Sequence, residues 1–302
     1  MVCVRYETMP DPVLTPPPTT AYVKPIQTLA VLGLGLLGGS MGLAAIANRV
    51  AVHVVGWSHR RETRDTALAR RAVHSICETP EQAVGGADMV VLATPIDAMP
   101  DLMKKIAPAL VRGTLVTDVG STKRRVVTAA AELLPRHVLF CGSHPMAGGE
   151  KGGIAQARVD LFQGQLAILT PIESTDPRAI HLFEQFYLSL GMRVARMRPD
   201  THDRRIAMVS HMPHVVAAAI VGAQADSSQS LAGPGYRDAT RIAMGDPSLW
   251  ADIVLDNRDN FLHALGRVSD ELQLVKQLVN SGDRRSLLAW LEENAKTRKE
   301  VV

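Results

Sequence analysis

The sequence is short of cysteine, of long apolar runs and of charge of one sign. Its three cysteines, Cys3, Cys77 and Cys141, are far apart and odd in number, which argues against a disulfide framework and indicates a reducing compartment. No stretch approaches the ~18 uninterrupted apolar residues of a membrane span, and the start lacks the basic and apolar pattern of a secretory signal. We therefore expect a cytoplasmic protein with no membrane partner.

The near balance of charge also argues against a nucleic-acid partner. The chain has 33 basic and 30 acidic residues and a net charge of +3. This excess of positive charge is too small to indicate binding to a nucleic-acid phosphate backbone. The pI near 8.8 suits small acidic molecules, and these are the ligands that we expect.

The order of apolar patterns predicts two domains after a tail. Residues 1–27 carry six of the 18 prolines and should be extended and poorly ordered. Residues 28–198 alternate short β-branched runs with helical patterns, which predicts a Rossmann-like, doubly wound parallel sheet. We expect its last strands at His137–Cys141, Gln165–Thr170 and Arg193–Met197, with a glycine-rich loop over a ligand at Gly142–Gly164.

After Pro199 the strand signals stop, so residues 199–302 should form an all-helical domain. The expected helices are Thr201–Ala225, Tyr236–Met244, Pro247 to about Asn280, and Arg285–Lys299. The third is too apolar for a solvated helix, which predicts burial in a homodimer. The apolar residues that recur in it at helical spacing are Leu249, Ile253, Leu262, Leu265, Val268, Leu272 and Val275.

The stretch LAVLGLGLLGGS, residues 29–40, predicts a dinucleotide-binding turn. Gly33, Gly35 and Gly38 have the G-x-G-x-x-G spacing between an apolar strand and a helical pattern. Glycine there permits a tight turn and close approach to a pyrophosphate, which the helix N-terminus stabilises. Leu36 and Leu37 complete the predicted contact with the cofactor.

The end of the second strand favours NADP over NAD. NAD-binding folds usually place an acid about 20 residues after the glycines, but this chain has none between Gly38 and Glu62. Ser58, Arg60 and Arg61 stand there instead, and arginine binds a phosphate in bidentate fashion. The alternative is a solvated first turn of the next helix.

Three further strand ends should lie on the same rim of the sheet. Thr94 and Pro95 follow one strand, where a cofactor crevice opens, although Pro95 could simply end the strand. Ser121, in TDVGSTK, opens the next helix and could be only its N-cap. His144 precedes Pro145, which restricts it to extended geometry, and an imidazole held there can exchange a proton near neutral pH.

The helical half adds two polar groups. His211 and His214 are three residues apart and share a helix face, with a kink expected at Pro213. Without further Cys, His, Asp or Glu partners they do not predict a metal site; they are core or interface histidines, or line a cavity. Of the two arginines in GPGYRDATR, Arg241 is the better candidate for binding a carboxylate.

Together these motifs resemble the prephenate/arogenate dehydrogenase family of tyrosine biosynthesis. The similar stretches are GLGLLGGS, ATP, TDVGSTK, GSHPMAGGEKGG, SHMPH and GYRDATR, in the family's order over about residues 28 to 300. The resemblance implies an NAD(P)-dependent oxidative decarboxylation that makes a cyclohexadienyl ring aromatic, without a metal. The sequence leaves open whether prephenate, arogenate or both are used.

The resemblance also implies roles for individual residues. His144 is similar to the family's catalytic histidine, and Ser121 to the serine that holds it and the ring hydroxyl. Arg241 and His214 match substrate-binding residues, and Glu150 and Asp238 match a polar gate around the pocket. His59 stands where NADP-dependent relatives often have arginine, so Arg60 would have to reach the phosphate. With no further domain in the sequence, feedback by tyrosine through one is not expected.

Two alternatives follow from the same patterns. Other NADP dehydrogenases, of the hydroxyisobutyrate or imine-reducing type, also join such a domain to a helical one, but the first type uses a lysine where this chain has His211 and His214. A non-enzymatic NADP-sensing protein would bind the cofactor and not react.

Overall fold

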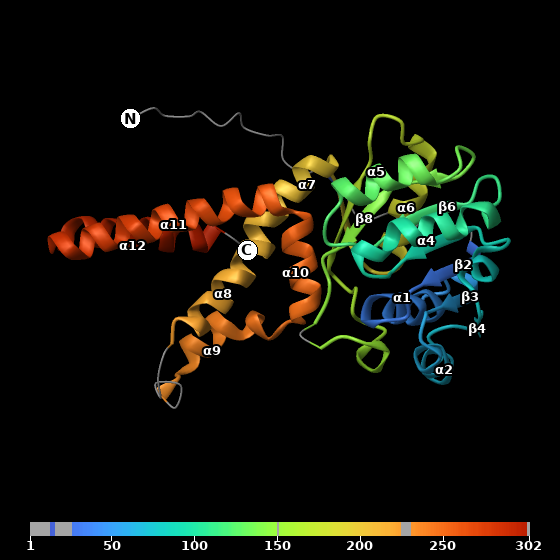
Figure 1. The fold of residues 1–302 in the computed structure, drawn as a ribbon, viewed down its shortest axis with the longest axis horizontal. Coiled ribbons are helices and arrows are strands. Elements are labelled where there is room, and N and C mark those ends of the chain that lie inside the picture. Colours follow the sequence, from blue (N-terminus) through green and yellow to red (C-terminus); the bar gives the residue numbers. More distant parts are fainter. Residues whose placement is uncertain (1–12, 16–25, 150, 225–230, 301–302) are drawn as a thin grey trace.

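Six parallel strands form the main sheet of the computed structural model, which describes residues 13–15, 26–149, 151–224 and 231–300 (Figure 1). Their order is β4-β3-β2-β5-β6-β7. Leu29 of the central strand pairs with Val54 on one side and with Met89 on the other, so the doubly wound parallel sheet is confirmed. The strands are β2 (Ile26–Leu32), β3 (Ala51–Trp57), β4 (Ser75–Ile76), β5 (Met89–Leu92), β6 (Leu115–Asp118) and β7 (Leu139–Phe140).

Helices cover both faces of this sheet because alternate residues of each strand point to opposite sides. Leu29 and Val31 belong to one apolar core, which also holds residues of α1 and α6. Ala30 and Leu32 belong to a second core, with residues of α4 and α5. The helices are α1 (Leu36–Ala47), α2 (Arg61–Ala69), α3 (Pro80–Val84), α4 (Met99–Ile106), α5 (Arg124–Leu133) and α6 (Pro177–Ser189).

The last strands of this half form a second sheet, so the expectation of one continuous sheet was wrong. The chain leaves the first sheet at Phe140, and His144 of the next strand pairs antiparallel with Ile168. The start of the expected loop at Gly142 is therefore a strand. The second sheet has the order β1-β10-β9-β8, with β1 (Val13–Thr15), β8 (Gly142–Pro145), β9 (Leu166–Thr170) and β10 (Arg193–Arg196).

Part of the expected tail also belongs to this sheet. Val13–Thr15 pairs antiparallel with β10, with Leu14 opposite Ala195. Residues 1–12 and 16–25 lie outside the described residues, so the expectation of poor order is not tested there. The main sheet begins at Ile26, three residues before the strand expected from Leu29 and two before the expected domain start at residue 28.

The helical half is more interrupted than the sequence predicted. The expected helix over 201–225 is α7 (Pro199–Ile206), a π-helical turn (Ala207–His211) and α8 (Met212–Gly222). Pro213 lies in the first turn of α8, where a missing N–H costs little, and the wide turn precedes it. The expected helix from Pro247 breaks at Asn257 into α10 (Pro247–Asp256) and α11 (Arg258–Ser281). The others are α9 (Pro234–Thr240), a 3₁₀ turn (Arg241–Met244) and α12 (Arg284–Glu300).

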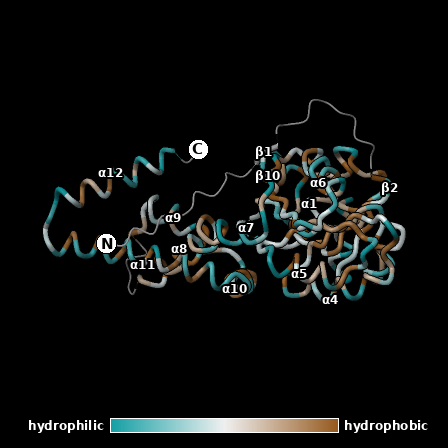
Figure 2. The backbone as a smooth tube through the Cα atoms, turned by 90° about the horizontal axis from the view of Figure 1, so that it is seen from above, coloured by the Kyte–Doolittle hydropathy of each residue, from teal (hydrophilic) through white to brown (hydrophobic). Residues whose placement is uncertain are grey.

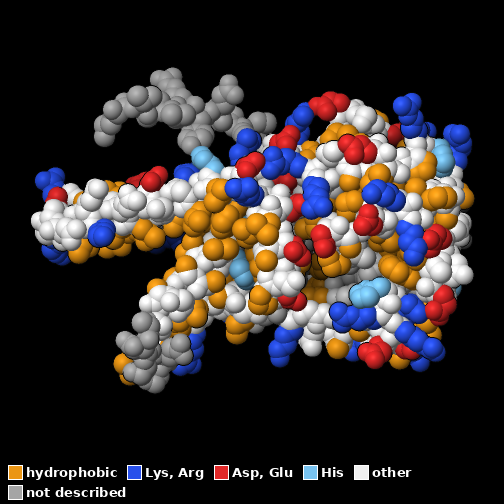
Figure 3. Space-filling model, viewed as in Figure 1, with side chains coloured by type: hydrophobic (Ala, Val, Ile, Leu, Met, Phe, Trp, Pro, Cys, Tyr) orange, Lys and Arg blue, Asp and Glu red, His pale blue; other side chains and the backbone are white. Residues whose placement is uncertain are grey.

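One face of the helical half exposes many large apolar side chains. In Figures 1 and 2, α11 and α12 extend away from the sheets, and Figure 3 shows apolar side chains gathered along these helices. Of the predicted apolar positions, Ile253 is buried, whereas Leu262 and Leu272 are 52% and 63% exposed. Exposed apolar surface on this scale marks an interaction site, which fits the predicted homodimer.

The segment Pro199–Gly222 also has the length and hydropathy of a helix that could cross a membrane. Only 28% of its most apolar window is buried, and Val209, Ile220 and Val221 are exposed. The same apolar surface is what a helix at a subunit interface needs, and the π-helical turn interrupts the segment.

A buried ion pair ties the two sheets together. Asp118, at the end of β6, and Lys123, just before α5, are both 0% exposed, and the Lys123 Nζ contacts Asp118 Oδ2. Lys123 Nζ also donates to the Ser143 carbonyl at 2.8 Å, and the Ser143 N–H donates to Asp118 Oδ1 at 3.1 Å. Since Ser143 lies in β8, this pair fixes β8, and with it His144, against β6.

We expect Asp118→Asn to lower the free energy of unfolding by about 3–5 kcal/mol, because it leaves the Lys123 charge buried without its partner. Urea unfolding measures the effect. The control is Asp101→Asn, which breaks an exposed pair with Lys104 and should cost less than about 1 kcal/mol. Equal, small losses in both variants would show that the buried pair does not hold the sheets.

Candidate active site at the junction of the two halves

The turn between β2 and α1 has the shape that a dinucleotide needs. Gly33 has φ +105°, and a Cβ there would collide with the carbonyl of Ala93; a Cβ on Gly38 would collide with the carbonyl of Gly33. By contrast, a Cβ on Gly35 would meet nothing within 4 Å. Gly35 precedes α1, which has no side-chain cap, so the helix N-terminus faces open space that a pyrophosphate would fit.

The remaining predicted cofactor residues surround this turn. Leu36 and Leu37 are half-buried in the first turn of α1. The backbone of Thr94 lies against Gly33, and the Thr94 Oγ1 is buried with no hydrogen-bond partner among the residues that the structure describes. An orphaned hydroxyl beside an open helix N-terminus fits a nicotinamide dinucleotide. Pro95 is exposed, and β5 ends three residues before it at Leu92, so Pro95 does not itself end the strand.

The end of β3 carries the predicted basic cluster. Ser58 is buried, whereas Arg60 and Arg61 are exposed at the start of α2. Arg60 Nε lies 3.3 Å from His59 Nε2, and Arg61 pairs with Asp65 at 3.6 Å.

Arg64 holds the start of this cluster in place, and no sequence pattern predicted its role. Its side chain is buried, and it donates to the Ser58 carbonyl at 2.8 Å and to Glu78 Oε2 at 2.7 Å. Arg64 therefore shapes the turn and is not available to a ligand.

His144 lies on β8 with one ring nitrogen bonded and the other available. It is 7% exposed, and its Nδ1 is 2.9 Å from Nε2 of His202. Within the described part of the chain, Nε2 of His144 has no hydrogen-bond partner. Burial lowers the pKa of His144 well below 6.5, and the nearby His202, Lys123 and His211 lower it further. The ring is therefore neutral and presents Nε2 to a bound molecule.

Behind His144 stands a second pair that the sequence analysis missed. His202 and Asp203 lie in α7 at the junction of the two halves, and His202 Nδ1 is 2.8 Å from Asp203 Oδ1. Asp203 also accepts the backbone N–H groups of Lys123 and Arg124, at 2.7 and 2.9 Å. The only sequence signal was a His-Asp dipeptide just after Pro199, at the predicted domain boundary.

Ser121 lies between β6 and α5 and is half-buried. Among the described residues no hydrogen bond joins it to His144, whose recorded partner is His202. The N-cap alternative was wrong, because the carboxylate of Asp203 caps α5 in its place. Ser121 thus does not cap the helix that follows it.

His211 and His214 share one side of their segment, as predicted, and both rings contact Trp250 of α10. His214 stacks on Trp250 with ring centroids 3.5 Å apart, and His211 meets it edge-on at 6.2 Å. Burial lowers the pKa of both, that of His211 to about 4. Both side chains are therefore buried where the π-helical turn and α8 pack against Trp250 of α10.

The remaining predicted residues lie farther out. Arg241 and Asp238 are exposed, on α9 and the turn after it, which Figure 1 shows well apart from β8. The turn Arg241–Met244 packs against α8, the helix that carries His214, and a Cβ on Gly245 would meet His214 and Trp250. Glu150 lies outside the described residues.

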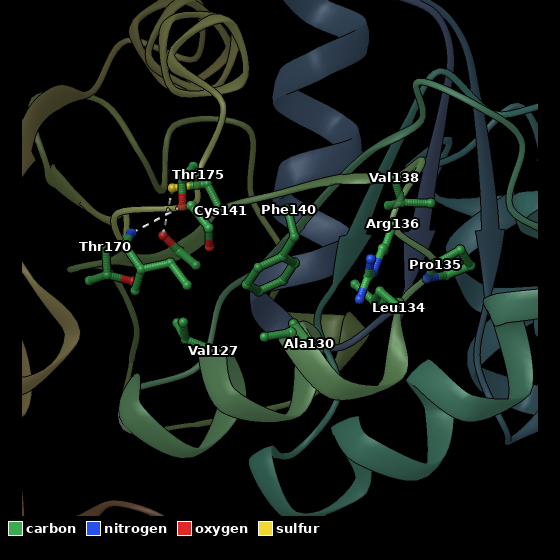
Figure 4. A pocket seen from close by; sticks show the side chains of 14 residues that line it. Val127, Ala130, Leu134, Pro135, Arg136, Val138, Phe140, Cys141, Thr170 and Thr175 are labelled. Carbon is green, nitrogen blue, oxygen red and sulfur yellow. Dashed lines mark hydrogen bonds between the residues drawn. The ribbon is translucent and has the colours of Figure 1, made fainter.

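Two cavities elsewhere do not involve any predicted site residue. One, of about 320 Å³, lies between α5 and β8, with Phe140 between Arg136 on one side and Thr170 on the other (Figure 4). The other, of about 390 Å³, lies between α5 and α10. Neither cavity therefore competes with His144 and its surroundings as the candidate site.

Comparison with known proteins connects this arrangement to one family. Residues 41–196 match the family model described as "Prephenate dehydrogenase, nucleotide-binding domain", and residues 198–293 match "Prephenate dehydrogenase, dimerization domain". The prephenate dehydrogenase of Bacillus subtilis is 33% identical over 274 residues, 88% of this chain and 74% of that protein. The cyclohexadienyl dehydrogenase of Zymomonas mobilis is 32% identical over 277 residues, 89% of this chain and 94% of that protein.

A solved structure extends the likeness to the whole architecture. The structure of prephenate dehydrogenase from A. aeolicus in complex with hydroxyphenyl propionate and NAD+ has a TM-score of 0.86 and 28% identity. The match covers 93% of this chain and 100% of that one.

The buried histidines predict a loss of stability in acid. Below pH 6.5 the unfolded chain binds protons that the folded His211 does not, so the free energy of unfolding falls as pH falls. With a folded pKa of about 4, His211 alone should remove about 2 kcal/mol between pH 7 and pH 5.

Urea unfolding of wild type and His211→Asn at the two pH values measures this. The variant should show a pH difference smaller by about that amount, whereas His181→Asn, which replaces an exposed histidine, should keep the wild-type difference. A pH difference unchanged in His211→Asn would refute the assignment.

Proposed function

The chain belongs to the prephenate dehydrogenase family, and from this premise we propose that it oxidises and decarboxylates prephenate, arogenate or both, in tyrosine biosynthesis. The observation that carries the proposal is His144, a neutral, buried imidazole with an available Nε2 at the contact between β8 and α7. That is the group that a ring hydroxyl needs as hydrogen-bond acceptor when its carbon loses a hydride.

The chemistry balances without a net proton transfer to His144. The ring carbon that bears the hydroxyl loses a hydride, which the nicotinamide accepts when bound, and the ring carboxylate leaves as CO₂. The electron pair of the broken carbon–carboxylate bond completes the aromatic ring, so the hydroxyl keeps its proton and becomes a phenol. His144 only has to accept a hydrogen bond, and its lowered pKa keeps it in the form that can do so.

The other proposed roles follow the sequence motifs. Ser121, half-buried beside the junction, would contact the ring hydroxyl. His214 would lie beside the substrate, and Arg241, on the turn that packs against α8, would bind a carboxylate. Glu150 and Asp238 would gate the pocket.

We propose NADP as the preferred cofactor, with NAD as the alternative. Gly33, Gly35 and Gly38 would hold the pyrophosphate, and Thr94 would lie beside it. Arg60 supports the choice of NADP, because its exposed guanidinium stands at the end of β3 with no acid before Glu62. The reaction would take place in the cytoplasm, in a homodimer built on the apolar face of the helices.

The direct test supplies prephenate and arogenate side by side with each cofactor and follows the absorbance of the reduced nicotinamide. We expect turnover with one or both substrates, and we expect His144→Asn to lower kcat by about 10²–10⁴-fold with little change in cofactor binding. Cofactor binding without turnover of either substrate would favour the NADP-sensing alternative. Near-normal turnover in His144→Asn would refute the role of His144.

Cofactor choice is tested by Arg60→Glu. The variant should lower kcat/KM for NADP by about 10–100-fold, because it removes a charge-assisted hydrogen bond of about 1.5–3 kcal/mol, and should leave NAD at its wild-type efficiency or better. Arg112→Glu, a charge change at an exposed site away from the cofactor turn, is the control. A clear NAD preference in the wild type would overturn the assignment.

A further inference from the structure

Three buried side chains form a continuous hydrogen-bonded line behind the substrate-facing nitrogen. His144 Nδ1 is 2.9 Å from His202 Nε2, and His202 Nδ1 is 2.8 Å from Asp203 Oδ1. His202 is 0% and Asp203 2% exposed. With water excluded, each hydrogen bond has to be matched by a donor and an acceptor inside the protein.

The donors and acceptors in this hydrogen-bonded line can be assigned starting from Asp203. This carboxylate faces only donors, since it also accepts the N–H groups of Lys123 and Arg124. Burial alone would raise the pKa of Asp203, but its hydrogen bonds to His202 and to the backbone together lower it, so the carboxylate is ionised. An ionised carboxylate only accepts, and His202 must therefore carry a proton on Nδ1.

The protonation state of His202 determines which ring donates the hydrogen bond between His144 and His202. Burial lowers the pKa of His202 more than the neighbouring Asp203 raises it, so His202 is neutral and its Nε2 has a lone pair. The hydrogen bond between the two rings must then be donated by His144 Nδ1–H. His144 is thereby left with no proton on Nε2.

We propose that His202, oriented by Asp203, is a positioning residue that fixes His144 in the tautomer protonated at Nδ1, and so leaves Nε2 as the acceptor for the substrate hydroxyl. The role toward the substrate hydroxyl rests on the proposed function, whereas the tautomer of His144 follows from the hydrogen bonds among the three side chains. A neutral histidine in water mostly carries its proton on Nε2, which would turn His144 from an acceptor into a donor.

The same pair connects His144 to the packing of the two halves. α7 contacts α5 and β9 of the sheet half and α11 of the helical half. Asn257, fully buried at the break between α10 and α11, donates to the Asp203 carbonyl at 2.7 Å. Next to it, Asp256 accepts from Thr122 at 2.5 Å and pairs with Arg125 at 3.1 Å. His202 is therefore in place only when the helical half is docked on the sheet half.

Nitrogen NMR of the histidine side chains tests the tautomer directly. In the full-length protein labelled with ¹⁵N-histidine, the signals lost in His144→Asn identify His144. We expect the pattern of a neutral ring protonated at Nδ1. A wild-type His144 protonated at Nε2 would overturn the proposal, and this measurement needs no variant of His202.

Two variants of His202 connect the tautomer to turnover. His202→Leu removes the acceptor, and we expect His144 to move its proton to Nε2, because its Nδ1–H would otherwise be buried without a partner. We expect kcat to fall by at least about 10-fold, with KM for the cofactor within about 2-fold. His202→Gln keeps an acceptor oxygen and should restore most of kcat and the Nδ1 tautomer. His181→Leu, at an exposed site, is the control.

The outcomes separate this inference from the proposed function. If His144 shows the Nδ1 tautomer and loses it in His202→Leu, but neither prephenate nor arogenate is turned over, the positioning role stands and the proposed function fails. If turnover is normal in His202→Leu, or the tautomer does not change, the positioning role fails while the proposed function stands.

Discussion

The buried contact between Asp118 and Lys123 is the interaction on which the rest of the site depends. A charge of either sign at 0% exposure is tolerated only with its partner, and this pair also bonds both backbone groups of Ser143. The pair therefore holds β8 of the second sheet against β6 of the first. His144 is the residue of β8 that follows Ser143. Burial is the main cause of the low pKa of His144, and the same ammonium group lowers it further, so the pair that positions the histidine also helps to keep it neutral.

The second constraint is the junction of the two halves at α7. Asp203 caps α5, orients His202 and is held by Asn257 from the helical half. A helix N-terminus that could have been capped by its own serine is instead capped from another domain, which ties the start of α5 to the docking of the helices. β8, through His144 and His202, the start of α5 and the helical half thus converge on one carboxylate.

The sequence predicted the parts that depend on local pattern. The strands around Gly33 and the helix after it follow from apolar runs and glycine spacing, and the collisions that a Cβ would cause at Gly33 and Gly38 explain those glycines. Two features could not be predicted from the sequence because they depend on contacts between distant residues. The second sheet arises from pairing of 142–145 with 166–170, and the partner of His144 lies 58 residues away in α7. The break at Asn257 was also not predicted, and the buried side chain there donates to the distant Asp203 carbonyl.

The surroundings of His144 suit an acceptor better than a base. A base would need a nearby acid to stabilise the imidazolium, but the groups around the ring are Lys123, His202 and His211, and each of them disfavours a positive charge there. Asp203 is one residue removed, behind His202, so its charge acts on the orientation of His144 more than on its basicity. In the proposed reaction the hydroxyl keeps its proton, and aromatisation supplies the driving force. A ring that resists protonation but is held in one tautomer therefore fits the proposed chemistry. Its burial is the main cause of the resistance to protonation, and its hydrogen bond with His202 orients it.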